Sequence, residues 1–248
     1  FNTTLPGAVT GDLVKGYYVI KAQQEEGRTR AFMTLLIDRF VGLFGLIVMA
    51  FLALIFNLEL ILSQERLHSL AWMIVALFGG TVLFYAIALF PFKKGHDPFL
   101  RLFQRLPASK FSIKVYSAFK RFQHKKTTLF LTLLLSIGLH TLIALIFFQV
   151  AHLMGIKEME LATQFFLMPI GLITVAIPIA PGGIGIGHVA FESLYQLAGL
   201  SGGADIFNLF IIVQLGVYLL GGIPYFLYSS EYKIPEHPEE MLKGEAEQ

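Results

Sequence analysis

The sequence predicts an all-α fold, a polytopic bundle of membrane helices with two broken or re-entrant helical segments. Of its 248 residues 15% are charged and 55% are hydrophobic, and the mean hydropathy is +0.67. Soluble domains usually carry about 25% charged residues. Five stretches contain no Asp, Glu, Lys or Arg: residues 40–58, 67–92, 127–156, 161–191 and 206–230. Each can supply the roughly 18–20 apolar residues that a membrane-crossing helix needs.

The basic residues predict the topology. Ten of the 19 Lys and Arg residues lie between Lys93 and Lys126. Because basic residues stay on the cytoplasmic side of short loops, we expect a multi-pass membrane protein with loop 93–127 and the C-terminus in the cytoplasm. Apolar residues recur at helical spacing among these cations, which fits helices lying in the membrane interface. Helices that pack beneath the bundle would show the same pattern. The cluster matches no motif for binding nucleic acid.

A proline and four glycines interrupt the fourth apolar stretch: Pro181, Gly182, Gly183, Gly185 and Gly187. Proline ends or kinks a helix, and glycines adopt conformations that other residues avoid. From His188 the pattern is helical again, so we expect a helix, a break and a second helix running back. Residues 5–12 have a similar Pro/Gly pattern. Two such segments indicate an internal repeat of the kind that frames binding sites in transporters.

Three motifs occur in order: Leu5-Pro-Gly…Gly11-Asp12-Leu-Val-Lys15, Leu35-Leu-Ile-Asp38-Arg39 and Pro178-Ile-Ala-Pro-Gly-Gly-Ile-Gly-Ile-Gly187. With these residues the chain resembles the lysylphosphatidylglycerol synthase transmembrane family, the flippase-like membrane part of enzymes that aminoacylate phosphatidylglycerol. The resemblance covers residues 1–230 and implies a helical bundle that handles lipids. This sequence departs from the family at two positions. Lys15 stands where the family commonly has Arg, and His188 stands where it often has Glu.

The resemblance also concerns the two ends of the chain. Family members begin with further helices, so we expect the natural protein to extend upstream of Phe1. At the other end, residues 231–248 form a short acidic tail in place of a soluble aminoacyl-transfer domain. We therefore expect a stand-alone form of the family without synthase activity.

Two charged pairs precede apolar segments. Asp12 and Lys15 share one face if a helix begins there, and they could grip a lipid head group; Asp12 could also cap the helix. Asp38 and Arg39 are adjacent on a predicted helix and so face different partners. Arg39 could bind a lipid phosphate through its planar guanidinium, or serve as an ordinary anchor at the membrane surface.

His188 and Glu192 lie four residues apart, where they could pair functionally or merely steady the helix start. Glu192 is the only acidic residue in 161–204, and charges at membrane depth are usually functional. A metal site is not expected, since no third ligand is near in sequence. The predicted substrate-binding residues are Asp12, Lys15, Asp38, Arg39, Pro181, Gly182, Gly183, Gly185, Gly187, His188 and Glu192.

These observations favour a lipid transporter or flippase that moves or binds polar lipids between leaflets. An alternative is a non-transporting membrane partner that presents a lipid or glycolipid to a separate transferase. A carrier of small solutes would share the broken-helix pattern. We expect phospholipids or glycolipids as partners, with a membrane enzyme or a second copy of the chain as further candidates. No enzymatic activity, no cofactor and no nucleic acid is predicted.

Overall fold

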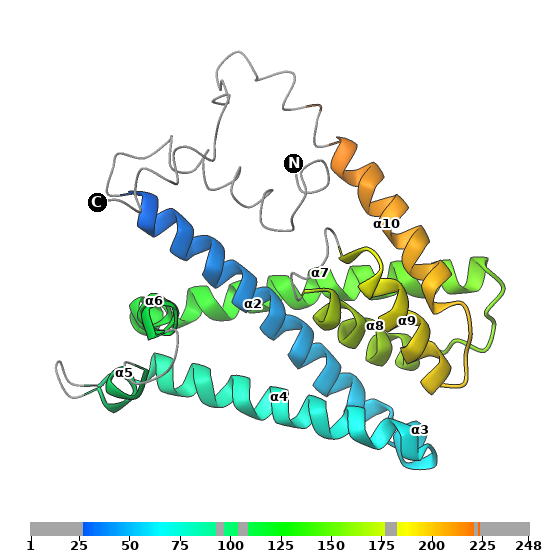
Figure 1. Cartoon of the computed structure of the whole chain (residues 1–248), viewed down its shortest axis with the longest axis horizontal. Coiled ribbons are helices and arrows are strands. Elements are labelled where there is room, and N and C mark those ends of the chain that lie inside the picture. Colours follow the sequence, from blue (N-terminus) through cyan, green and yellow to red (C-terminus); the bar gives the residue numbers. More distant parts are fainter. Residues whose placement is uncertain (1–26, 93–96, 104–108, 177–182, 221–222, 224–248) are drawn as a thin grey trace. The chain divides into compact units, whose positions relative to one another are not determined.

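Helices account for the regular structure of the described part of the chain, which confirms the predicted all-α class. The computed structural model describes residues 27–92, 97–103, 109–176, 183–220 and 223. Its elements are α2 (Gly27–Phe56), α3 (Leu58–Ser63), α4 (Glu65–Leu89), α5 (Pro98–Phe103), α6 (Ser109–Lys120), a 3-10 turn (Arg121–His124), α7 (Lys126–Leu153), α8 (Leu161–Val175), α9 (Ile186–Leu197) and α10 (Gly203–Leu220) (Figure 1).

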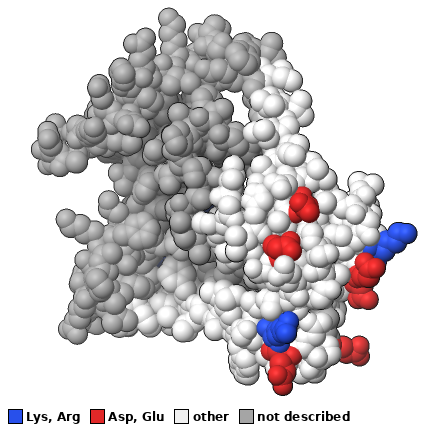
Figure 2. Space-filling view, turned by 45° about the vertical axis from the view of Figure 1, so that its right-hand side comes forward, with Lys and Arg blue, Asp and Glu red and all other residues white. Residues whose placement is uncertain are grey.

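Three of these helices are long and apolar enough to cross a membrane: Ile37–Phe56 of α2, Glu65–Leu89 and Lys126–Leu153. At 1.5 Å per residue, each reaches or exceeds the hydrocarbon thickness of about 30 Å. Large apolar side chains project outward from them, including Trp72 on α4 and Leu135 on α7. Figure 2 shows a face on which most of the described surface is uncharged, with the acidic and basic side chains on its right-hand side. These features confirm the membrane class.

Helix α2 is the central element of the bundle and packs against α4, α6, α7 and α8. In Figure 1 it crosses α7 and converges with α4 toward α3. A small residue permits its close approach to α7, because a Cβ atom at Gly45 would lie 2.5 Å from the Ser136 hydroxyl oxygen. At its far end Asn57 is buried and donates from Nδ2 to the carbonyls of Ala53 and Ala162. These bonds tie the end of α2 to the start of α8.

The fourth apolar stretch forms an antiparallel helical hairpin of α8 and α9. Three contacts pair residues in reverse order: Gln164 with Tyr195, Gly171 with Phe191, and Val175 with Gly183. The described residues thus form two helices that pack antiparallel, while residues 177–182 lie outside the described part and the re-entrant segment stays a prediction. With 15 and 12 residues, α8 and α9 are about 22 and 18 Å long. Neither alone crosses about 30 Å of hydrocarbon.

Helix α6, which belongs to the basic loop, packs against α2 and α4. The face of α6 that carries Val115, Tyr116 and Phe119 is buried in one cluster with Val41 and Ala88. Helix α6 therefore packs against the bundle, and its position at the membrane interface stays a prediction. The chain divides into two units, residues 1–210 and 211–248, and the hairpin and the start of α10 belong to the first.

Candidate functional site

The turn of the hairpin depends on glycine conformations. Gly183 and Gly185 have φ angles of +72° and +87°, in the left-handed region that only glycine adopts without strain. Gly183 is also buried against the side chain of Val175, which leaves no room for a Cβ atom. The sequence therefore marked these glycines correctly as special positions. Pro181 and Gly182, together with Asp12 and Lys15, lie outside the described residues.

His188 connects this turn to α10. Its Nδ1 atom accepts a hydrogen bond from the Gly185 amide at 3.1 Å, and its Nε2 atom lies 2.6 Å from Oδ1 of Asn208. This pair of bonds requires the neutral tautomer with the proton on Nε2, since Nδ1 is the acceptor. The Phe207 ring packs edge-on against the imidazole. Asn208 was missed by the sequence analysis, because nothing in the chain order pairs it with His188.

Glu192 has partners of its own and does not pair with His188. One carboxylate oxygen accepts from Nε2 of Gln196 at 2.9 Å, and the other accepts from the Ala204 amide at 3.1 Å. Ala204 lies in the first turn of α10, where free amide groups and the helix dipole favour a negative charge. Glu192 therefore caps α10 from the neighbouring helix. Its predicted role in substrate binding stays a prediction.

Glycine also permits close packing around α9. A Cβ atom at Gly187 would enter the ring of Phe207, which is buried. A Cβ atom at Gly203 would lie 2.6 Å from the carbonyl carbon of Phe191 and 2.9 Å from the Glu192 nitrogen. The hairpin and the start of α10 therefore form one tightly packed block. Gly203 was not singled out in the sequence, because its neighbours come from α9.

A buried polar pair joins α8 and α9. The Tyr195 hydroxyl donates to Oε1 of Gln164 at 2.6 Å, and both residues are fully buried. Nε2 of Gln164 has no hydrogen-bond partner among the described residues. An unsatisfied amide in an apolar interior is costly, so it is a feature that calls for a ligand, a water molecule or a function. The only sequence signal was a glutamine inside an apolar run.

Asp38 and Arg39 are both exposed on α2. Helix α8 starts beside Asn57 and runs back alongside α2 in Figure 1, and the two helices are in contact. From Asn57, Arg39 lies about 27 Å back along α2, and α8 covers about 22 Å. That Asp38 and Arg39 belong to one site with the turn stays a prediction.

The structure defines a polytopic α-helical membrane protein with a glycine-dependent helical hairpin packed against long, apolar helices. Residues 1–221 match the family described as lysylphosphatidylglycerol synthase TM region, and the chain belongs to this family. The family's membrane region is not itself the catalytic domain of the synthases, and it relates the chain to lipid handling. No curated protein and no solved structure matches the chain.

Proposed function

We propose that the protein is a lipid transporter of the flippase type, which moves polar lipids between the leaflets of a bacterial inner membrane. The observation that carries this proposal is the α8–α9 hairpin, whose two helices are too short to cross the membrane. Irregular backbone at membrane depth persists only where protein buries it or water reaches it. Short helices that meet at such a turn are typical of substrate sites in transporters.

The head group would pass along a polar path beside this turn. Arg39 would bind the lipid phosphate through two parallel N–H donors. The His188–Asn208 pair would offer hydrogen bonds at the turn. Asp12, Lys15, Asp38 and Glu192 would complete the path, while acyl chains remain in the bilayer. Residues 1–230 would form this flippase-like domain, with residues 231–248 as a cytoplasmic acidic tail.

Orientation follows from the basic loop, which we place in the cytoplasm together with the C-terminus. We infer no enzymatic activity for this chain. A second candidate function is supported by the family itself, whose membrane region accompanies a catalytic domain in the synthases. In that case the chain would present a lipid or glycolipid to a separate transferase without transporting it.

The test is lipid translocation in proteoliposomes that contain the natural full-length protein. Phosphatidylglycerol and phosphatidylethanolamine labelled on the head group would report movement between leaflets. Arg39→Gln should slow translocation about tenfold, as expected for the loss of one charge-assisted contact. Arg66→Gln is the matched control, because Arg66 is also exposed but lies at the start of α4. No movement by folded protein, together with a stable transferase complex, would favour the second candidate.

A further inference from the structure

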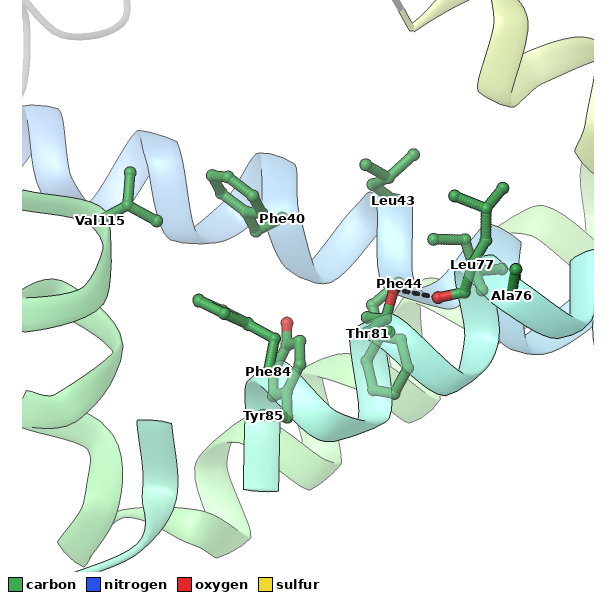
Figure 3. Close-up of a pocket in the computed structure, with 11 residues that line it drawn as sticks. Phe40, Leu43, Phe44, Ala76, Leu77, Thr81, Phe84, Tyr85 and Val115 are labelled. Atoms are coloured by element: carbon green, nitrogen blue, oxygen red, sulfur yellow. Dashed lines mark hydrogen bonds between the residues drawn. The ribbon is translucent and has the colours of Figure 1, made fainter. Parts of the chain in front are cut away.

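An apolar groove lies between α2 and α4, on a different part of the bundle from the hairpin (Figure 3). Its volume is about 410 Å³, within the usual range of ligand sites. Phe40, Phe44 and Ile47 line it from α2, while Ala76 and Gly80 face it from α4. Thr81 is its main polar wall residue, and its hydroxyl already donates to the Leu77 carbonyl at 2.7 Å. The groove therefore suits an apolar occupant.

The groove exists because small residues of α4 face α2 and no α2 side chain fills the space above them. Ala76 and Gly80 lie four residues apart, on one side of α4. In membranes such pairs usually let helices approach closely. Here a Cβ atom at Gly80 would meet nothing within 4 Å. No described residue covers the space from outside, since Gly80 and Leu77 are exposed.

Aromatic side chains hold the two helices apart at one end of the groove. Phe44 stacks on Tyr85 with ring centroids 4.6 Å apart, and Phe40 and Phe84 are stacked at 6.5 Å. Phe119 of α6 closes this end, with its ring 5.1 Å from that of Tyr85. Because Phe119 is fully buried, the closure is part of the folded bundle.

The length and position of the groove match one leaflet of a bilayer. From Ala76 to Tyr85 the α4 wall is about 14 Å long, and half of the hydrocarbon thickness is about 15 Å. The aromatic end lies near Leu89, where α4 ends and the basic loop follows. The groove therefore runs from near one membrane surface toward the bilayer centre, which is the path of an acyl chain.

Tyr85 supplies a polar group at the aromatic end. Its hydroxyl oxygen is buried and has no hydrogen-bond partner among the described residues. Figure 3 shows it pointing across the groove toward Phe40. A buried tyrosine hydroxyl normally finds a partner. Tyr85 lies about 6 Å inside the end of α4, a depth at which an ester carbonyl could accept its hydrogen bond.

We propose that this groove binds one acyl chain of a bilayer lipid from the leaflet next to the basic loop, with the Tyr85 hydroxyl donating to the ester carbonyl. The proposal goes beyond the transport function, which concerns the head group. An acyl chain bound here could accompany transport or serve only to fill the bundle. Binding and translocation are therefore separate measurements.

The experiment uses the full-length protein in liposomes of phosphatidylglycerol that contain increasing fractions of the same lipid with a photoreactive diazirine in its acyl chain. Labelled residues are identified by mass spectrometry after illumination. We expect labelling at Leu77 and Thr81 to saturate at a low fraction of probe. Labelling at Leu135, exposed on α7, should rise in proportion to the probe. Proportional labelling at both places would overturn the proposal.

Two adjacent glycines provide a matched pair of variants. Gly80→Leu fills the groove, while Gly79→Leu adds the same side chain one position away, outside the groove lining. A Cβ atom at either position meets nothing within 4 Å, so both variants should fold. We expect Gly80→Leu to lose the saturable labelling and Gly79→Leu to keep it. Equal labelling of both variants would contradict the proposal.

The ester contact is tested with Tyr85→Phe. This variant should bind the ester-linked probe about two- to tenfold more weakly, the usual worth of one neutral hydrogen bond. An ether-linked probe lacks the carbonyl, so its binding should not change. If the variant binds both probes equally more weakly, Tyr85 does not donate a hydrogen bond to the ester carbonyl. Saturable labelling without translocation would refute only the transport proposal, and translocation with proportional labelling would refute only the groove.

Discussion

The α8–α9 hairpin and the α2–α4 groove use glycine in opposite ways. In the hairpin block, Gly187 lies against the Phe207 ring and Gly203 against the backbone of Phe191. Gly80 lines the groove and Gly79 lies next to it, and neither has an atom within 4 Å of an added Cβ. The same residue type therefore lets backbones touch in one region and leaves space in the other.

Aromatic packing shows the same difference. Phe191 is fully buried and stacks on Phe147 and Phe207, each with ring centroids 5.0 Å apart. The groove aromatics meet only at its closed end, next to Phe119. Interdigitated rings make the hairpin a rigid block, whereas the groove can admit a flexible chain. Under the two proposals, the rigid part would position head groups and the open part would accommodate acyl chains.

The largest effect is expected for Gly203→Ala. The added Cβ would meet backbone atoms of Phe191 and Glu192, which cannot rotate away, so we expect a loss of about 3 kcal/mol of unfolding free energy. Unfolding by SDS titration in mixed micelles would measure it. Gly138→Ala on α7 is the control, because no atom lies near its added Cβ. If both variants unfold alike, the hairpin block is not tightly packed.

A second comparison pairs two buried tyrosines. Tyr195→Phe leaves Gln164 with neither amide atom satisfied among the described residues, which should cost about 2 kcal/mol. Tyr85→Phe removes a hydroxyl without a partner, so in lipid-free micelles its unfolding free energy should stay the same or rise. The same SDS titration measures both variants. If Tyr85→Phe loses more unfolding free energy than Tyr195→Phe, the groove region and not the hairpin is the tightly packed part.

The sequence predicted the helices of this protein better than their contacts. Runs without charge correctly located the long helices, because membrane depth excludes charge along the chain itself. The glycines at 183 and 185 were predicted as a break, since their effect on φ is local. Partners such as Gln164 with Tyr195, or His188 with Asn208, are set by how helices meet. Chain order alone does not contain that information, and the open groove at Gly80 was missed for the same reason.

A smaller effect is expected where Asp97, just before α5, is hydrogen-bonded to α6. Its carboxylate accepts hydrogen bonds from the Tyr116 hydroxyl, the Lys120 ammonium and the amides of Phe99 and Leu100. Burial alone would raise the pKa of Asp97, but the bonds from Lys120, Tyr116 and Leu100 and the charge of Lys120 together lower it.

Asp97→Asn should therefore destabilise this corner by about 1 kcal/mol, since the amide oxygen keeps the cap but loses the ion pair. The stabilisation by the ionised carboxylate is present above the ordinary aspartate pKa of about 3.9 and is lost as the pH falls through the lower folded value. Hydrogen exchange of the α5 amides measures both effects. Lys125→Gln, an exposed cation of the same loop, should leave that exchange unchanged.

The smallest effect has the opposite sign and completes the comparison of glycines. Gly79→Ala and Gly80→Ala should each raise the unfolding free energy by about 0.5–1 kcal/mol in lipid-free micelles, because alanine favours the helix and its Cβ meets nothing. Gly203→Ala makes the same chemical change and should destabilise. A loss of stability at Gly80 but not at Gly79 would show that the groove is already occupied by protein. In that case the space between α2 and α4 belongs to the packed part of the bundle, and the rigid region extends beyond the hairpin.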